Sequence, residues 1–262
     1  MRIFTIASGL LAAANLAHAA AATPPIDSPV PAATAPAATT PAADSNTIVA
    51  TDAEDAANKV AYRAAVDMVN KGQPAIAVAM LDKLIPRLEK RYAHPGQQIY
   101  CGQSQTEVLA YMLTAAADKR SAVAVDAELC SAYFHRAYAN VDLGKLDNAQ
   151  ADLERALALA PKNPHYLSEM AALHTRRHEF NEALALYHQA LDLAPTFSAE
   201  GRANAEQGVA LRGIGYVLVE LGNLDEAEAA YRRCLEIDPD DRKAQGELEY
   251  IQGVRERTAS AR

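Results

Sequence analysis

The sequence predicts an all-α protein in which one unit of two antiparallel helices is stacked several times. The first observation is recurrence, because "LGKLDNAQADLERALALAP" at 143–161 returns in altered form as "LGNLDEAEAAYRRCLEIDP" at 221–239. The second is composition. Half of the residues are hydrophobic and many of these are alanine, whereas tryptophan is absent. Such a composition favours helices that pack closely through small side chains.

The repeated unit has a period of 34 residues. This spacing separates three pairs of equivalent residues, namely Pro161 and Pro195, Ala149 and Ala183, and Ala156 and Ala190. Pro239 follows Pro195 by 44 residues, which is one period plus an insertion of ten. In the first helix of each unit a large residue precedes a small one by four positions, so both lie on one helical face. These pairs are Tyr133 with Ala137, Leu167 with Ala171, and Leu211 with Gly215.

The chain resembles the tetratricopeptide repeat family in this period and in these residues, over roughly 127–242. The resemblance implies a right-handed α-solenoid with three clear repeats, the first of which begins with a helix at 127–142. Each first helix is expected to end at a glycine, as at Gly144 and Gly222, and each second helix at a proline. In the second repeat, His178 occupies the place where glycine is usual.

Helices are also expected on both sides of the clear repeats. Residues 52–91 predict two helices of a degenerate repeat, 94–104 a loop and 105–118 another helix, so 52–126 forms an N-terminal helical region. Residues 196–222 predict either one long helix with Ser198 as its N-cap or a loop followed by an ordinary helix. After Pro239, a face made by Ala244, Leu248 and Ile251 predicts a capping helix, and the repeat array with this cap spans 127–257.

The N-terminal region predicts export from the cell. Residues 1–19 combine Arg2, a short apolar run and small residues at Ala17 and Ala19, which is the pattern of a cleaved signal peptide. Residues 20–51 are rich in Ala, Pro and Thr and have little to bury, so we expect a disordered tail. The expected location is the bacterial periplasm.

The three cysteines leave one question open. In an oxidising compartment an odd count leaves at least one cysteine unpaired within the chain. Cys234 falls at a place where the repeat requires a small buried residue, so we expect it in the core. Cys101 and Cys130 can either form a disulfide or stay free, because the sequence does not fix the distance between them.

The composition and motifs argue against catalysis and nucleic-acid binding. The formal net charge is −8 and no basic block is present, whereas binding to phosphate backbones relies on clustered Lys and Arg. The sequence contains no phosphate-binding glycine loop, nucleophile elbow or Cys-x-x-Cys motif. His174 and His178 have the spacing of two metal ligands on one helix, with His188 nearby, but Thr175 replaces the glutamate of a metalloprotease helix. We therefore expect ordinary repeat positions, no cofactor, no metal, no small-molecule substrate and no enzyme activity.

The resemblance also implies where a partner binds, since the first helices of successive tetratricopeptide repeats line a concave groove. Aromatic and arginine side chains carry much of the energy of such interfaces. The expected groove residues are Phe134, Tyr138, Asp142, His165, Ser168, Arg176, Arg212, Tyr216 and Glu220. The expected function is a non-enzymatic module that binds a peptide segment or helix of a cell-envelope protein. The alternative is a homo-oligomeric scaffold built by edge-to-edge stacking of repeats.

Overall fold

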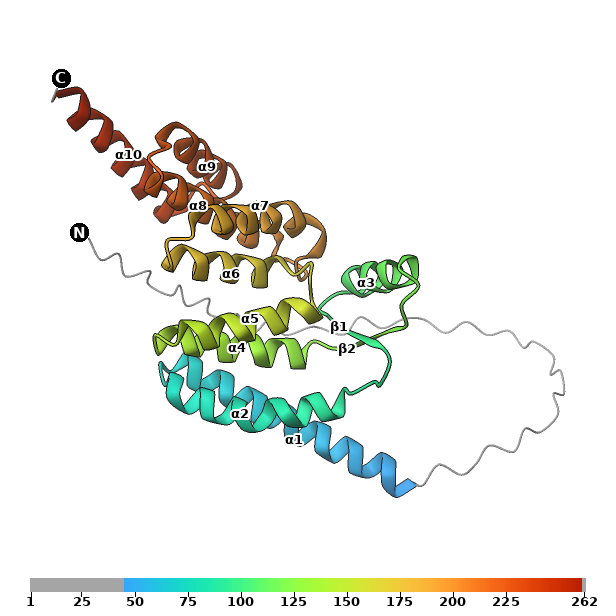
Figure 1. The fold of residues 1–262 in the computed structure, drawn as a ribbon. Coiled ribbons are helices and arrows are strands. Elements are labelled where there is room, and N and C mark those ends of the chain that lie inside the picture. The colour runs from blue at the N-terminus through green and yellow to red at the C-terminus, as the bar shows by residue number, and fades with distance from the viewer. Residues whose placement is uncertain (1–44, 261–262) are drawn as a thin grey trace, which may run out of the picture. The chain divides into compact units, whose positions relative to one another are not determined.

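The computed structural model describes residues 45–260, and the packing discussed below lies within residues 55–260. Four antiparallel helix pairs follow one another in the chain (Figure 1). They are α1 (Ser45–Asn70) with α2 (Pro74–Arg91), α4 (Glu128–Asp142) with α5 (Leu146–Leu159), α6 (Pro164–Arg176) with α7 (Phe180–Phe197), and α8 (Ala203–Glu220) with α9 (Leu224–Ile237). The last helix, α10 (Arg242–Ser260), packs on α9. The predicted all-α, repeat-stacked fold is confirmed.

All four pairs are closed by the same tight turn. The second residue after each first helix takes a positive φ, which is 66° at Gly72, 71° at Gly144, 61° at His178 and 81° at Gly222. The next backbone N–H then donates to a carbonyl five residues earlier, as from Lys145 to Asn140 at 2.9 Å. This is the Schellman arrangement, which satisfies carbonyls that the helix end leaves free. The α1–α2 pair therefore turns in the same way as the three clear repeats.

His178 is the strained member of this set, since a side chain disfavours the left-handed backbone that glycine adopts freely. We predict that His178→Gly raises the free energy of unfolding by about 0.5–1 kcal/mol, because the relief of strain outweighs the lost edge contact with Phe180. Urea unfolding followed by circular dichroism measures the change. Gly144→Ala, which introduces the strain, is the matched control and should lower stability by about 1 kcal/mol. A destabilised His178→Gly protein would contradict this account.

The prolines end two of the three second helices. α5 and α9 stop before Pro161 and Pro239, as predicted, but α7 runs through Pro195 to Phe197, so that part of the prediction was wrong. The helix continues because Ala194 is buried in the core and its carbonyl accepts a hydrogen bond from the N–H of Ser198, which closes one further turn.

The ten-residue insertion forms a short loop followed by an ordinary helix. A single helix over 196–222 is excluded because the chain leaves helical geometry between α7 and α8, with Gly201 at a φ of 74°. Ser198 is therefore not the N-cap of a long helix. Its hydroxyl instead donates to Glu206 of α8 at 2.6 Å, and this bond fixes the loop against the helix.

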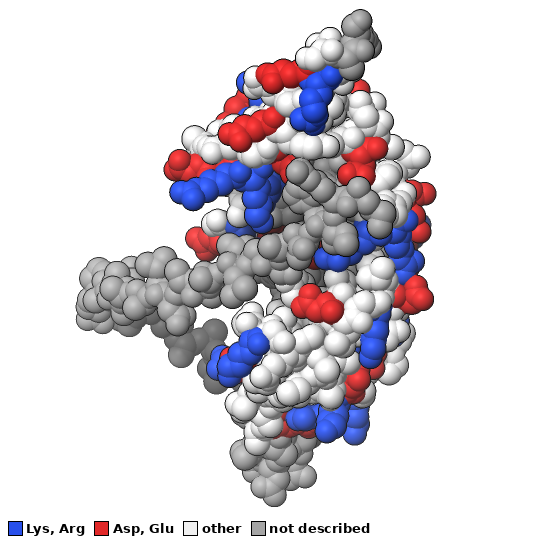
Figure 2. All heavy atoms as spheres, turned by 90° about the vertical axis from the view of Figure 1, so that its left-hand side faces the viewer, with Lys and Arg blue, Asp and Glu red and all other residues white. Residues whose placement is uncertain are grey.

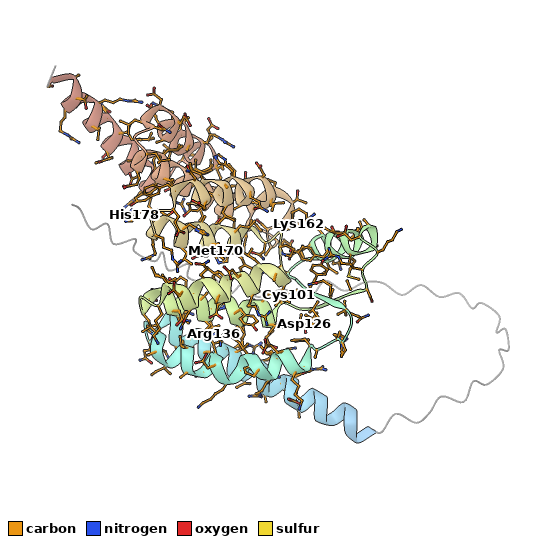
Figure 3. The ribbon with its side chains drawn as sticks, viewed as in Figure 1. Cys101, Asp126, Arg136, Lys162, Met170 and His178 are labelled. Atoms are coloured by element: carbon orange, nitrogen blue, oxygen red, sulfur yellow. A yellow bond between two sulfur atoms is a disulfide. The ribbon has the colours of Figure 1, made fainter. Side chains whose placement is uncertain are left out.

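The core of the repeats consists of two clusters of buried hydrophobic residues that meet at α6. Met170 and Leu173 face the cluster shared with α1, α2, α4 and α5, while Leu167 and Ala171 face the cluster shared with α7 to α10 (Figure 3). Small residues allow the helices to approach, since a Cβ added to Gly215 would lie 2.6 Å from the ring of Tyr231. The three repeat tyrosines and Cys234 are buried, as the sequence predicted for Tyr133, Tyr187, Tyr231 and Cys234.

A β-α-β unit that the sequence did not predict lies between α2 and α4. It consists of β1 (Gln98–Gly102), α3 (Gln105–Ala117) and β2 (Ala122–Asp126), and the strands are parallel. The prediction of a loop over 94–104 was therefore wrong. Side chains alternate across this sheet, so that Tyr100 packs towards α3 while Cys101 and Val125 pack towards the repeats. Both faces of the parallel pair are thus covered.

The β-α-β unit is fastened to the repeats at several points. A disulfide joins Cys101 of β1 to Cys130 of α4, with the two Cα atoms 6.3 Å apart, which answers the question left open by the sequence. The hydroxyl of Tyr111 in α3 accepts a hydrogen bond from the N–H of Lys162 in the α5–α6 turn at 3.1 Å (Figure 3). The same hydroxyl donates to the buried carboxylate of Glu107 at 2.6 Å. The unit therefore connects two neighbouring repeats.

The predicted signal peptide and most of the predicted tail lie outside the described residues. Among the helices that the structure describes, none combines the length and the apolar character needed to span a bilayer.

Candidate functional site

The first helices of the four pairs place a set of equivalent side chains in one register. One such position lies ten residues before the positive-φ residue of each turn, and it is occupied by Tyr62, Phe134, Ser168 and Arg212 in the four pairs. Tyr138 and Tyr216 each stand six residues before theirs. Side chains at matching positions of successive first helices line one face of a repeat array, which is the groove predicted above.

Phe134 is the centre of an aromatic cluster that joins α4 to α6. Its ring centroid lies 4.7 Å from that of His165, 5.3 Å from that of Tyr166 and 6.5 Å from that of Tyr138. These separations are typical of rings that stabilise one another. Phe134 and Tyr166 are buried, whereas Tyr138 and His165 are partly exposed. The structure therefore brings three of the predicted groove residues together, Phe134, Tyr138 and His165.

The cluster continues onto α1 through two residues that the sequence analysis missed. The ring of His135 lies 5.1 Å from that of Phe134 and 5.6 Å from that of Tyr62, both edge to face. Nδ1 of His135 lies 2.7 Å from the carbonyl oxygen of Ser131 and 3.1 Å from the hydroxyl of Tyr62. The place of Tyr62 could have been found by counting ten residues back from Gly72.

Burial changes the proton affinity of this cluster. Burial lowers the pKa of His135 and raises the pKa of Tyr62, since each charged form loses water. Burial also raises the pKa of Tyr166 to about 12, although Ser131 and Gln103 lie within hydrogen-bonding distance of its hydroxyl. At neutral pH these three side chains are therefore uncharged, and this part of the groove presents aromatic surface with hydroxyl and imidazole groups.

The lowered pKa of His135 predicts acid sensitivity. The pKa of His135 is lower in the folded chain than its unfolded value of about 6.5, so the unfolded chain binds the proton more readily. The contribution of His135 to stability is therefore complete at pH values above about 6.5, and it is lost as the pH falls through the folded pKa. We predict that wild-type protein loses more stability than His135→Gln between pH 7 and pH 5. Urea unfolding at both pH values measures this difference, and parallel losses in the two proteins would contradict it.

The polar groove residues fall into two groups. Arg212 already has a partner within the protein, because its guanidinium forms an ion pair with the carboxylate of Asp241. The other carboxylate oxygen of Asp241 accepts hydrogen bonds from the N–H groups of Lys243 and Ala244 and so caps α10. Arg212 thus fastens α8 to α10. Asp142 and Arg176, in contrast, are exposed and have no ion pair or hydrogen bond with the described residues.

Three predicted groove residues remain, Tyr216, Glu220 and Ser168. Tyr216 is partly exposed; burial raises its pKa, and the neighbouring carboxylate of the exposed Glu220 raises it further. Ser168 is buried, and its hydroxyl has no hydrogen-bond partner within the described part of the chain. The predicted groove residues are thus aromatic on α4 and at the start of α6, and the charged Asp142, Arg176 and Glu220 lie at the C-terminal ends of α4, α6 and α8.

The paired histidines considered as a metal site contact different partners. Nδ1 of His174 lies 2.6 Å from a carboxylate oxygen of Glu179, and the ring of His178 lies edge to face on Phe180. Among residues 53–260, no three His, Cys, Asp or Glu side chains are grouped as a metal site requires. Positive and negative side chains are interleaved over the face drawn in Figure 2, and neither sign gathers into a single patch there.

Comparison with known proteins identifies the repeats. The tetratricopeptide repeat family matches residues 131–163 and 163–240. The Protein CTR9 homolog of Arabidopsis thaliana is 36% identical over 101 residues, which is 38% of this chain and 8% of that protein's length. The first tetratricopeptide domain of Spaghetti (RPAP3), solved with the HSP90 peptide SRMEEVD, is 24% identical, with a TM-score of 0.43, over 50% of this chain and 95% of that one.

A fourth comparison concerns the fold alone. The structure reported in a functional characterization of pilF from Pseudomonas aeruginosa has a TM-score of 0.54 at 12% identity, over 78% of this chain and 71% of that one. The shared fold, the matched repeats and the four identical turns agree with one another. Residues 131–240 of the chain are therefore tetratricopeptide repeats.

Proposed function

We propose that the protein is a non-enzymatic interaction module that binds a peptide segment or a helix of a partner protein in the groove of its first helices. The observation that carries this proposal is the aromatic cluster around Phe134, which extends over α1, α4 and α6. Its partly exposed members are Tyr62, His135, Tyr138 and His165. Rigid aromatic side chains lose little conformational entropy on binding and supply large contact areas, which is why they concentrate binding energy.

The charges around the cluster supply the polar contacts. Asp142 lies one helical turn beyond Tyr138, and Glu220 lies one turn beyond Tyr216, so each carboxylate shares a face with a tyrosine. Arg176 occupies the corresponding end of α6. Since Asp142 and Arg176 have no partner among the described residues, both can pair with a ligand without first breaking a bond within the protein. Such rim charges set orientation and specificity more than affinity.

The proposed setting is the bacterial periplasm, and the proposed partner is a protein of the cell envelope. Two features support this setting. Residues 1–19 have the charge and hydropathy pattern of a signal peptide. The Cys101–Cys130 disulfide belongs to a class of bonds that persists in oxidising compartments. The mass of the protein purified from its host tests this point, because cleavage after Ala19 removes the first 19 residues.

The alternative, a homo-oligomeric scaffold built by edge-to-edge stacking of repeats, has less support at the C-terminal end. Ala244 and Ile251 of α10 are buried against the last repeat, while charged residues such as Arg242, Lys243 and Glu249 are exposed. A helix of this kind covers the apolar end of an array and presents a polar surface to water.

The binding test uses a displayed library of random peptides selected on the wild-type protein, followed by calorimetric titration of a selected peptide. The groove variant is Tyr138→Ala with Arg176→Ala and Tyr216→Ala, and it leaves Arg212 in place because that side chain supports α10. Its matched control is Tyr250→Ala with Arg233→Ala, which removes an exposed tyrosine of α10 and an exposed arginine of α9. We expect the groove variant to lose at least about tenfold in affinity and the control to lose less than about twofold.

A further inference from the structure

The β-α-β unit brings one of its side chains to an end of the groove. Gln103 follows β1 directly and is exposed. Its Nε2 donates a hydrogen bond to the hydroxyl of Tyr166 at 3.3 Å, and the same hydroxyl lies 3.5 Å from Oγ of Ser131. The ring of Tyr166 stacks on Phe134, the centre of the aromatic cluster. Gln103 therefore lies beside the groove although it belongs to none of the repeats.

Ser131 belongs to the groove by its place in the register. It stands thirteen residues before the positive-φ residue of its turn, and His165 holds the same place in the next repeat. Both side chains are partly exposed and lie in the first turns of α4 and α6. The charged groove residues of these helices stand at the opposite ends. The end of the groove beside Gln103 therefore offers hydroxyl, imidazole and amide groups to a ligand.

A covalent bond and a hydrogen bond hold Gln103 in this position. The Cys101–Cys130 disulfide lies two residues before Gln103 on β1 and one residue before Ser131 on α4. The backbone N–H of Gln103 donates to a carboxylate oxygen of Glu107 at 2.7 Å. A binding group that is fixed before the ligand arrives loses less entropy on binding.

The side-chain amide of Gln103 has unused hydrogen-bonding capacity. A glutamine amide has two N–H donors and an oxygen that can accept two hydrogen bonds. Among the described residues this amide bonds to Tyr166 alone, through Nε2, so Oε1 is available to accept an N–H from a ligand. The main chain of a peptide carries one N–H at every residue except proline. In an α-helix all but the first four of these groups are bonded within the helix, whereas in an extended segment they are free.

We propose that Oε1 of Gln103 accepts a hydrogen bond from a main-chain N–H of the bound peptide, and that the groove therefore takes an extended segment rather than a helix. This inference rests on the proposed function of the groove. It gives the β-α-β unit a part in ligand binding in addition to its contacts with the repeats.

The test combines protein variants with N-methylated peptides in calorimetric titrations. Gln103→Met keeps the length of the side chain and removes its polar atoms, and each analogue of the library-selected peptide lacks one main-chain N–H. We expect Gln103→Met to lose about fivefold in affinity for the unmodified peptide. One analogue should bind the wild type more weakly than the unmodified peptide does, and should bind the wild type and Gln103→Met equally, since the same bond is missing from both complexes. Far-ultraviolet circular dichroism should show no gain of helix when the peptide binds.

Gln97→Met is the matched control, because Gln97 is exposed just before β1 and its Nε2 donates to Oγ of Ser121 at 3.2 Å. We expect this control to lose less than about twofold in affinity. All variants must first give the helical signal of the wild type. If the groove variant loses affinity but Gln103→Met does not, if no analogue shows the coupling, or if the peptide gains helix, this inference is wrong and the proposed function stands. If neither variant loses affinity, or if no peptide can be selected, both fail.

Discussion

Replacing Cys101 and Cys130 with serine is expected to lower the free energy of unfolding by about 3 kcal/mol. The disulfide closes a loop between residues 29 positions apart, and a bond of this span restricts the unfolded chain by about that amount. It also joins β1 to α4, so its loss removes one of the contacts that fasten the β-α-β unit to the first clear repeat. Urea unfolding followed by far-ultraviolet circular dichroism measures the change.

The reduced wild type is the matched control for this experiment. Its stability in the presence of a thiol should equal that of the Cys101→Ser, Cys130→Ser protein, because both lack only the covalent bond. Cys234 is buried and free, so the thiol does not act through it. Equal stability of the oxidised wild type and the double variant would show that the disulfide does not support the fold.

Replacing Arg136 with methionine is expected to destabilise the protein by about 3 kcal/mol. Arg136 forms a bidentate pair with Asp152, at 2.9 Å from Nε to Oδ2 and 2.6 Å from Nη2 to Oδ1, between α4 and α5 (Figure 3). The side chain of Asp152 is only 7% exposed. Methionine fills most of the same space but leaves a buried carboxylate without its cation, and this is the costly outcome when a buried pair is broken.

A double variant separates the cost of the lone charge from the value of the pair. Arg136→Met with Asp152→Leu removes both charges, and we expect it to recover most of the lost stability. If the double variant is as unstable as Arg136→Met alone, the loss comes from packing or from the second contact of Arg136, with Asp82 at 2.8 Å. Thermal and urea unfolding of the four proteins of this cycle provide the comparison.

The repeats could be predicted from the sequence because each is specified locally. Glycine at 144 and 222 takes the positive φ that ends a first helix, and alanine at 137 and 171 permits close helix packing. Pro195 was misjudged because a buried Ala194 holds the helix for one more turn. The β-α-β unit was missed for a different reason. Its strands have five residues each, and their pairing depends on a parallel partner 24 positions away.

The clustering of some predicted groove residues could be anticipated from the sequence, but their individual contacts could not. Phe134, Tyr138 and His165 come together as expected, since the repeat register fixes their faces. Arg212 was expected to face a ligand, but its charge is satisfied by Asp241, a pairing across 29 residues that no local pattern shows. His135 of α4 links the cluster to Tyr62 of α1, a helix whose repeat character is weak in sequence and is evident in its turn geometry.

The central claim is that the groove of the first helices binds a peptide segment, and calorimetric titration of a library-selected peptide tests it most directly. Wild-type protein is titrated beside the Tyr138, Arg176 and Tyr216 alanine variant and beside the control that lacks Tyr250 and Arg233. All three must first give the same helical circular dichroism signal. A loss of at least about tenfold in affinity in the groove variant alone is the predicted result. Equal affinity in the wild type and the groove variant would contradict the account.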